Sequence, residues 1–475
     1  MKEFEKNAQL TLNWIAEYLR EIEKLPVPSQ VKPGEIYNSI EDIPPEKPKD
    51  FNKILKEFEK KIIPGITHWN HPKFMAYFNS TSAEPGILAE FIIAAMNING
   101  MNWKSSPAAT ELERKTMNWF RQILNLPEDF WGIIYDTASV SSMHALASAR
   151  EKSLQKFDFR KKGFAGNKDI PPLRIYISEH AHSSIEKGAL TLGFGLEGIR
   201  KIPADKNFKM IPAELQKAVA EDKAKGFLPV FATATIGTTS TTSVDPVKEI
   251  AKICKEENMW LHVDAAFAGV TAMLPENKHF FSGWENADSI VVNPHKWLFI
   301  PIDISLFYTK HPKTLKQAFS LVPEYLKTDE DDEVENLMDY GIQLGRRFRS
   351  LKLWISIKYF GVEGLRKIIR EHIRLGKLFG SWIDENNDFE LLAPIPFSVV
   401  CFRALPGNTN NEDELNKFNE RLMQNINSTG KLFLSHTKLN GKFTIRLAIS
   451  GYRQEERHVK EAWELIREEY QKIKH

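Results

Sequence analysis

The pattern of hydrophobic and polar positions changes along the chain and divides it into regions. From about residue 130, short apolar runs alternate with stretches whose apolar residues recur at helical spacing. The runs GIIY, RIYIS and LPVFATAT each precede such a helical stretch, and the β-rich runs WLHVD, DSIVVN and ISLFYT follow. Alternating strands and helices are typical of an α/β layer with a mostly parallel central sheet. We therefore predict an α/β fold for the middle of the chain.

The two ends of the chain show other patterns. The first 25 residues carry acids throughout and have the spacing of an amphipathic helix, which is not typical of a signal peptide. A proline-rich connector follows over residues 26–50. Beyond a long helical stretch, β-like segments flank a helix at about 412–429, and Asn440-Gly441 is a strong hairpin-turn signal. The patterns predict an N-terminal helical arm (1–84), a large α/β domain (85–375) and a small C-terminal α+β domain (376–475).

Composition narrows the class of protein. The chain has 475 residues, 42% of them hydrophobic and 27% charged, and its net charge of +2 gives no reason to expect nucleic acid or a membrane as a partner. The most apolar long stretch, GILAEFIIAAMNING, is interrupted by Glu90 and is too short to span a bilayer. Cys254 and Cys401 have neither metal-ligand nor redox spacing, which favours a reducing, cytoplasmic setting.

Polar residues follow five of the predicted strands. Asp264 ends WLHVD and Lys296 follows SIVVNPH, and further polar groups follow the other three strands, namely Thr137, Ser139, His180, His182, Thr238 and Thr239. Each of these has an ordinary explanation as a cap, a solvated charge or turn chemistry, and no third ligand accompanies the histidines to suggest zinc. Ligands of parallel α/β sheets lie beyond the carboxyl ends of strands. Taken together, these residues predict a binding site there.

This set of residues suits pyridoxal phosphate chemistry. Lys296 would form a Schiff base with the cofactor aldehyde, and Asp264 would keep the pyridine nitrogen protonated so that the ring accepts electrons. The sequence DTAS at 136–139 could offer hydroxyls and helix N-terminal amides to the phosphate. His182 is a candidate to cover the ring. The apolar neighbours of Lys296 predict a desolvated amine with a lowered pKa.

Seven motifs make the prediction more specific: HWNHPKFMAYF (68–78), SSPAATELE (105–113), AHSSIEKG (181–188), TIGTTSTTSVD (235–245), WLHVDAAFAG (260–269), NPHKWL (293–298) and LGRRFRSLKLW (344–354). In this order the chain resembles the aromatic-L-amino-acid decarboxylases, a branch of the group II pyridoxal-phosphate decarboxylases. The resemblance implies a fold-type I PLP-dependent transferase. It also implies a homodimer with its active site at the subunit interface and the N-terminal arm wrapped over the partner.

The resemblance also implies roles for individual residues. Lys296 would hold the cofactor, Asp264 would pair with the pyridinium nitrogen, and His182 would stack on the ring and orient the substrate. The residues that match cofactor contacts, mainly around the phosphate, are Ala138, Ser139, Thr239, Asn293 and His295. The substrate pocket would include Ser80, Trp69, Phe78 and Met101, which together favour a large, mostly apolar side chain. Tyr325 matches a mobile-loop tyrosine that protonates the substrate carbon, and the acidic run 329–335 suits a lid.

Some residues depart from the family pattern, and alternative functions stay open. Met101, Asp136-Thr137, Val140 and Asn79 differ from the usual residues, so the preferred aromatic amino acid is not determined. Related enzymes make aldehydes by oxidative deamination and typically replace the loop tyrosine or the stacking histidine. Since Tyr325 and His182 are both present, we predict simple decarboxylation to an amine and CO2. A cofactor-free binding scaffold is disfavoured by the intact Lys296 and Asp264, and an aminotransferase is disfavoured by the arrangement of the motifs.

Overall fold

The computed structural model describes residues 1–321, 333–407 and 409–474. The chain forms two compact units. Unit 1 consists of residues 1–79, 374–392 and 398–475, and unit 2 of residues 80–373 and 393–397. The arm and the C-terminal segment thus share one unit, and the three-part division at residues 84 and 375 stays a prediction.

Unit 2 is built on a seven-stranded sheet in the order β1-β7-β6-β5-β4-β2-β3. The strands are β1 (Trp131–Tyr135), β2 (Leu173–Ser178), β3 (Ile199–Ile202), β4 (Leu228–Thr235), β5 (Trp260–Asp264), β6 (Ser289–Val292) and β7 (Ser305–Thr309). Strand β7 runs antiparallel to both of its neighbours, and the other pairings are parallel. The mostly parallel sheet predicted from the alternating pattern is confirmed.

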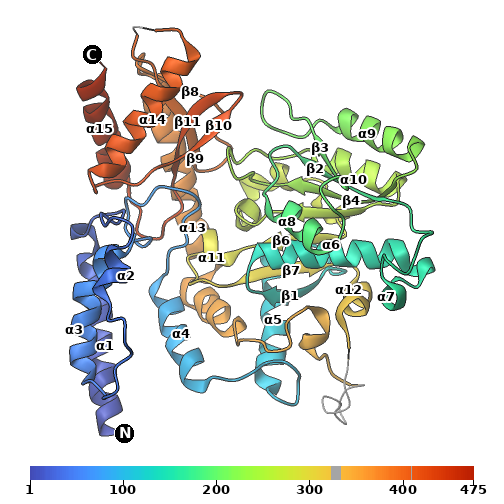
Figure 1. Ribbon diagram of the computed structural model, residues 1–475, viewed down its shortest axis with the longest axis horizontal. Coiled ribbons are helices and arrows are strands. Elements are labelled where there is room, and N and C mark those ends of the chain that lie inside the picture. Colours follow the sequence, from blue (N-terminus) through green and yellow to red (C-terminus); the bar gives the residue numbers. More distant parts are fainter. Residues whose placement is uncertain (322–332, 408, 475) are drawn as a thin grey trace. The chain divides into compact units, whose positions relative to one another are not determined.

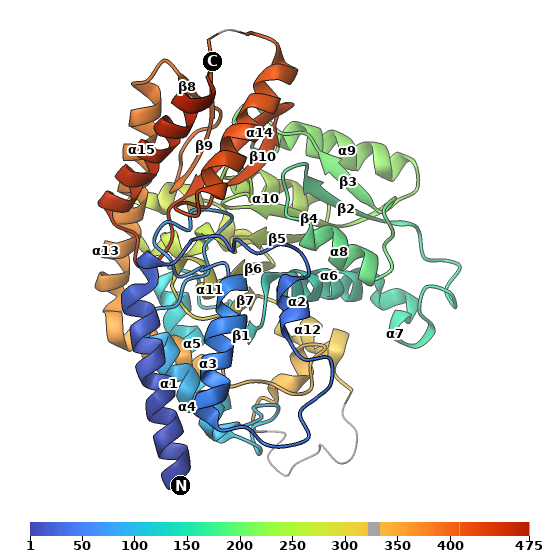
Figure 2. The same ribbon diagram turned by 60° about the vertical axis from the view of Figure 1, so that its left-hand side comes forward.

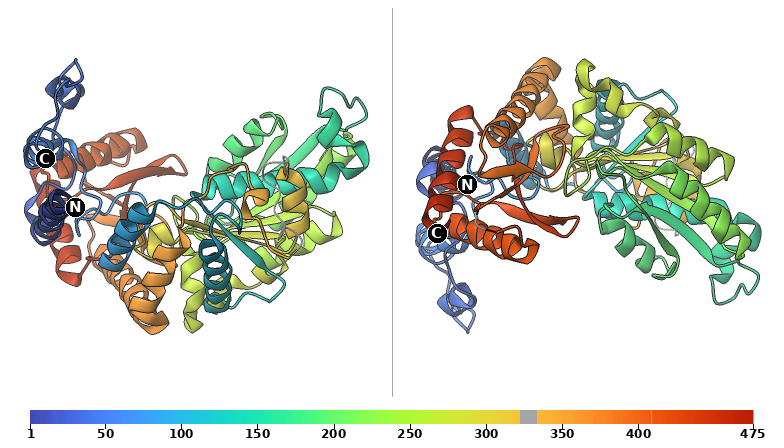
Figure 3. Two further views of the ribbon diagram at one scale, coloured as in Figure 1. Left: turned by 90° about the horizontal axis from the view of Figure 1, so that it is seen from below. Right: turned by 90° about the horizontal axis from the view of Figure 1, so that it is seen from above.

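Helices cover both faces of this sheet, as Figures 1 and 3 show. The helices of unit 2 are α4 (Glu84–Met96), α5 (Pro107–Ile123), α6 (Ala138–Leu154), α7 (Phe159–Lys162), α8 (Ser184–Thr191), α9 (Pro212–Ala224), α10 (Val247–Glu256), α11 (Pro294–Trp297) and α12 (Pro312–Phe319). The five residues of β5 (WLHVD) are all buried, which explains why its sequence shows no regular alternation of apolar and polar positions before Asp264. The short strand β3 was not predicted, because it is a partly exposed edge strand that carries charged residues.

Helix α13 (Ser350–Asp384) begins in unit 2 and ends in unit 1, and Gly361 interrupts its helical geometry with a φ of 62°. Unit 1 also contains α1 (Lys2–Glu21), α2 (Glu35–Ser39), α3 (Phe51–Lys61), α14 (Glu412–Ser428) and α15 (Glu456–Ile473). Its antiparallel sheet has the order β10-β11-β9-β8, with β8 (Phe389–Leu391), β9 (Val399–Ala404), β10 (Ser435–Leu439) and β11 (Lys442–Ala448).

The predicted hairpin joins β10 to β11. Asn440 and Gly441 have φ values of 50° and 82°, and both therefore occupy the left-handed region that a tight hairpin turn requires. In the arm, α1 and α3 lie side by side (Figure 2), and Trp14 meets Phe58 edge-on with ring centroids 5.4 Å apart. Among the described helices, none combines the length and the apolar character that crossing a bilayer requires.

Candidate active site

The parallel strands bring the predicted site residues to one edge of the sheet. Strands β1, β2, β4, β5 and β6 all point the same way, so their carboxyl ends lie together. Five segments follow these ends: residues 136–139 after β1, His182 after β2, Thr239 after β4, Asp264 at the end of β5, and residues 293–296 after β6. This is the edge at which α/β sheets bind ligands.

Three ionisable residues influence one another at this edge. Burial lowers the pKa of the Lys296 amine, and the negative charge of Asp264 opposes this effect. Burial also lowers the pKa of His182, which Asp264 raises and Lys296 lowers further. Asp264 acts on both Lys296 and His182, and Lys296 acts on His182, so the three side chains lie in one neighbourhood at this edge. A lysine with a lowered pKa is more readily available as a neutral nucleophile.

The Asp264 carboxylate is held in place by backbone groups. Its Oδ1 accepts a hydrogen bond of 3.0 Å from the amide of Ala266, and its carbonyl oxygen accepts one of 2.9 Å from the amide of Ile236. The side chain is only 6% exposed. This arrangement leaves Oδ2 as the oxygen that suits a protonated ring nitrogen.

The orientation of His182 is set by Ser184, a residue that the sequence analysis did not single out. The Ser184 amide donates to His182 Nδ1 over 3.1 Å, and the Ser184 hydroxyl lies 2.8 Å from the same nitrogen. Since Nδ1 accepts a backbone hydrogen, the neutral ring carries its own hydrogen on Nε2. A serine two residues after a candidate histidine is a local signal that could have identified this contact.

His295 and Asn293 form a second ordered pair. His295 Nδ1 accepts the amide hydrogen of Ile304 over 3.0 Å, so Nε2 carries the hydrogen of the neutral ring. Asn293 Nδ2 lies 3.3 Å from Nε2, while its buried Oδ1 has no hydrogen-bond partner. Turning the carboxamide by 180° lets Oδ1 accept from Nε2, and the amide nitrogen then occupies the buried position that lacks a partner. In that orientation the Asn293 amide has donors left that suit an anionic oxygen.

Thr239 differs from the other residues of the TTSTTS turn. Thr238, Thr241 and Ser243 are buried and bonded to one another, with hydroxyl distances of 3.1 Å and 2.8 Å from Thr238. Gly237 has a φ of 89°, and a Cβ there would lie 2.7 Å from the Cβ of Ala268. Turn chemistry therefore explains the three buried residues, whereas Thr239 is exposed at the tip.

The N-terminus of α6 is the place where the sequence predicts a phosphate contact. Its first amides lack carbonyl partners within the helix, and the dipole of a 17-residue helix favours an anion there. Asp136 is the unusual acid next to this site. Its carboxylate accepts hydrogen bonds from the Thr137 amide (2.5 Å) and from Gln343 Nε2 (2.6 Å), so part of its charge is bound within the protein.

Trp297 fixes the short helix that carries Lys296. The indole is fully buried and stacks on Phe267 with ring centroids 4.6 Å apart, and its Nε1 donates to His372 Nδ1 over 2.9 Å. His180, the other histidine after β2, packs edge-on against Phe208 instead. The two residues thus have packing roles next to the residues of the site.

The predicted substrate residues belong to both units. Ser80 and Met101 lie in unit 2, and Trp69 and Phe78 lie in unit 1, where Trp69 stacks on Phe74 at 4.3 Å and Phe78 lies beneath the guanidinium of Arg446. Their role as a substrate pocket stays a prediction.

The proposed proton donor and most of the predicted lid are not among the described residues. Tyr325 and residues 329–332 lie outside them. At the described end of the acidic run, Glu335 forms an ion pair with Arg114 over 2.8 Å and accepts a hydrogen bond from Trp131 Nε1 over 2.9 Å.

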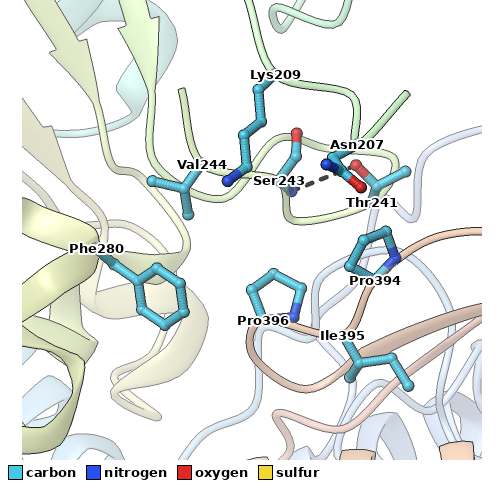
Figure 4. Close-up of a pocket in the computed structure, with 9 residues that line it drawn as sticks. All are labelled: Asn207, Lys209, Thr241, Ser243, Val244, Phe280, Pro394, Ile395 and Pro396. Atoms are coloured by element: carbon cyan, nitrogen blue, oxygen red, sulfur yellow. Dashed lines mark hydrogen bonds between the residues drawn. The ribbon is translucent and has the colours of Figure 1, made fainter. Parts of the chain in front are cut away.

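A separate cavity of about 370 Å³ lies beside the TTSTTS turn (Figure 4). Its lining consists of Asn207, Lys209, Thr241, Ser243, Val244, Phe280, Pro394, Ile395 and Pro396. None of the predicted cofactor contacts is among these residues. The cavity therefore is not the site at the strand ends, although the two share the turn.

Comparisons with known proteins point to one family of enzymes. Residues 33–405 match the family model of the pyridoxal-dependent decarboxylase conserved domain. The chain is 40% identical to tyrosine decarboxylase 2 of Narcissus pseudonarcissus (98% of this chain, 94% of the relative) and 39% identical to phenylacetaldehyde synthase of Petunia hybrida (98% and 94%). The structure matches that of Oryza sativa TDC with PLP and tryptamine, with a TM-score of 0.96, 34% identity, and coverage of 100% of this chain and 99% of that one.

The groups at the strand ends fit pyridoxal phosphate. They supply an amine with a lowered pKa beside a fixed carboxylate, an imidazole of fixed tautomer, a buried amide that lacks one partner, and a helix N-terminus for the phosphate. Since the family model covers most of the chain, the chain belongs to the pyridoxal-dependent decarboxylase family and is a pyridoxal-phosphate-dependent carboxy-lyase.

Proposed function

We propose that this enzyme removes the carboxylate of aromatic L-amino acids to give the corresponding amine and CO2. The observation that supports this most strongly is the group of Lys296, Asp264 and His182 at one sheet edge, where the charge of Asp264 acts on both of the other residues. A desolvated amine beside a fixed carboxylate is the arrangement that pyridoxal phosphate requires.

The residues divide the work between holding the cofactor and handling the substrate. When bound, pyridoxal phosphate supplies an electron sink for the bond that breaks. Lys296 would anchor the cofactor, and Asp264 Oδ2 would face its ring nitrogen. Asn293 and His295 would contact the cofactor, mainly at its phosphate, together with Ala138, Ser139 and Thr239. His182 directs its Nε2 hydrogen toward the substrate carboxylate.

We further propose that the substrate side chain contacts Trp69, Phe78, Met101 and Ser80, and that Tyr325 returns a proton to the substrate carbon. Three of the four pocket residues are large and apolar, which suits an aromatic ring. Excluding water would keep other proton donors away from the substrate carbon, so that Tyr325 would supply the proton.

Product analysis tests the substrate class. The purified protein, loaded with cofactor, is incubated with tryptophan, tyrosine, DOPA, phenylalanine, histidine and glutamate, and amines are quantified. We expect an amine from at least one aromatic substrate and none from glutamate. Amine formation from glutamate alone would refute the aromatic assignment. Lys296→Ala should lose both the activity and the yellow absorbance of the bound cofactor.

An aldehyde-forming activity is the second candidate, and one observation favours it. Phenylacetaldehyde synthase of Petunia hybrida is nearly as similar to this chain as tyrosine decarboxylase 2 is, with 39% against 40% identity. We propose that decarboxylation dominates, because the chain has both His182 and Tyr325. We expect no stoichiometric hydrogen peroxide or ammonia. One peroxide per turnover would instead assign an aldehyde synthase.

We also propose that the enzyme is a homodimer with its active site at the subunit interface and the arm wrapped over the partner. Helix α4 exposes an apolar stripe of Leu88, Phe91, Ile92 and Met96, which needs a cover in water. Light scattering of the variants Leu88→Glu and Ile92→Glu tests this proposal, with the exposed loop residue Leu196→Glu as a control. We expect the α4 variants, but not the control, to shift toward monomer. If both α4 variants remain dimers, this face of α4 is not part of the dimer interface.

We propose a cytoplasmic location for the enzyme. The chain has two cysteines, Cys254 and Cys401, and both are buried free thiols. Free thiols are usual in a reducing compartment.

A further inference from the structure

Lys352 is a buried charge near the start of α13. Its side chain has no solvent exposure, although lysine is among the residues least often buried. It is the third residue of the helix, where the helix dipole disfavours a cation. A lysine in such a place needs compensating contacts, and these contacts suggest what it does.

Two acceptors on different elements bind the ammonium group. Lys352 Nζ donates to Glu90 Oε1 over 2.7 Å and to the carbonyl oxygen of Pro301 over 2.8 Å. Glu90 lies on α4 and also pairs with Arg347. Asp303 pairs with Arg349 through two hydrogen bonds of 2.8 Å and 3.3 Å. Lys352 thus links α13, α4 and the segment that contains Pro301.

That segment, residues 299–304, connects the Lys296 helix to β7. Phe299 has a φ of 60°, which a residue with a side chain adopts only where its surroundings hold it. The Phe299 carbonyl accepts the amide hydrogen of Ala83 over 2.8 Å. At the other end of the segment, the Ile304 amide donates to His295 Nδ1 and so fixes the tautomer of that ring.

We propose that Lys352 is a positioning residue for the cofactor site. By binding the Pro301 carbonyl, it holds segment 299–304 in the conformation in which Ile304 orients His295, and Glu90 fastens this arrangement to α4. The inference rests on the proposed contact of Asn293 with the cofactor phosphate, in which His295 orients Asn293. It predicts that Lys352 controls cofactor affinity without touching the cofactor.

Electrostatics agree with this role. The cation of Lys352 lowers the pKa of His295, to which burial contributes most. His295 therefore stays neutral and keeps the tautomer that the Ile304 amide requires. The cluster has three cations, Arg347, Arg349 and Lys352, against the carboxylates of Glu90 and Asp303. Its net positive charge suits a phosphate nearby.

The first test is cofactor affinity of Lys352→Met, with Lys358→Met as a matched control. Lys358 is an exposed lysine on the same helix. Each apoprotein is titrated with pyridoxal phosphate, and binding is followed by quenching of tryptophan fluorescence. We expect Lys352→Met to bind the cofactor at least about tenfold more weakly and Lys358→Met to bind it as the unmodified enzyme does.

A double variant separates positioning from stability. Lys352→Met alone removes one of the cations that pair with the Glu90 carboxylate, and we expect it to lower Tm. Lys352→Met combined with Glu90→Leu removes both charges, so Tm should largely recover. The Pro301 carbonyl still lacks its donor, so we expect cofactor affinity to stay about tenfold weakened.

Two results would overturn the proposal: unchanged affinity in Lys352→Met, or affinity that recovers together with Tm in the double variant. If the single variant does not fold, the affinity of the double variant decides alone. These outcomes are distinct from failure of the proposed function, because cofactor titration involves no substrate. A His295→Gln variant with unchanged affinity would show that cofactor binding does not depend on His295, and it would overturn the route from Lys352 through this residue.

Discussion

At the scale of single residues, neighbouring backbone groups determine the state of each side chain in the site. The Ser184 amide fixes the tautomer of His182, the Ile304 amide fixes that of His295, and the Ala266 amide orients Asp264. A backbone N–H group can only donate a hydrogen bond, so the side-chain atom that it contacts must be the acceptor. The chemistry of the site thus depends on strand ends and turns as much as on the side chains themselves.

The neutral state of His295 predicts a pH dependence of stability. Burial lowers its pKa from 6.5 to about 4. Between these values the unfolded chain binds a proton that the folded chain does not, so stability falls as pH decreases from about 6.5 to about 4. The full loss in the free energy of unfolding is about 3 kcal/mol. Denaturant unfolding of the apoprotein at several pH values should show this loss.

The variant His295→Gln isolates the contribution of this residue. Other groups also titrate in this range, and Asp245, whose buried carboxyl has its pKa raised to about 6, acts in the opposite direction. These effects cancel in the difference between the free energies of unfolding of the unmodified protein and the variant. We expect this difference to shrink as pH falls. A difference that does not change with pH would mean that His295 has the same pKa in the folded and the unfolded protein.

At the scale of elements, α4 is important because it contacts the segment after Lys296 while exposing an apolar stripe on its other side. Glu90 of α4 reaches Lys352, and Gly86 lies against Pro301. A Cβ at position 86 would lie 2.4 Å from Pro301 Cδ, so only glycine allows this approach. The glycine in the apolar stretch GILAEFIIAAM is therefore explained by packing.

We predict that Gly86→Ala destabilises the protein by about 1–3 kcal/mol, because the added methyl group overpacks the contact with Pro301. The measurement is the denaturation midpoint together with cofactor affinity. Gly364→Ala is the matched control, since a Cβ there meets only Phe360 at an ordinary 3.7 Å. The control should be neutral or stabilising by up to about 1 kcal/mol, as alanine favours helix. Equal effects of the two substitutions would contradict the packing argument.

At the scale of the whole molecule, the predicted cofactor-anchoring residues and the proposed positioning residue all belong to unit 2. Ligand binding stabilises the structure that contains the binding groups. The cofactor should therefore protect segments 136–139, 264–266 and 293–304 most strongly from opening.

Hydrogen exchange with and without pyridoxal phosphate tests this distribution. We expect slower exchange in those three segments of unit 2 and smaller changes in β10 and β11 of unit 1. A cofactor concentration 100 times Kd should also add about 2.7 kcal/mol to the free energy of unfolding. Lys296→Ala should reduce both effects. Protection spread evenly over the chain would contradict a site confined to the strand ends of unit 2.

The sequence alone predicted most strands of the large sheet and the edge at which the candidate site residues lie. Apolar runs predicted the buried strands, because a strand that is covered on both faces lacks the alternating polar positions of a half-exposed strand. The polar residues after these runs predicted the ligand edge, since parallel strands end together. The Asn440-Gly441 turn was predictable for an equally local reason, namely its need for two left-handed residues.

Only the tertiary structure revealed the groups whose roles depend on distant partners. Lys352 lies 262 residues from Glu90 and 51 residues from Pro301, so no local pattern shows that its ammonium is buried between them. The orphaned Asn293 oxygen and the close approach of Gly86 to Pro301 likewise arise where separate segments meet. Strand patterns reflect local burial, whereas hydrogen bonds and packing between segments exist only after the chain has brought those segments together.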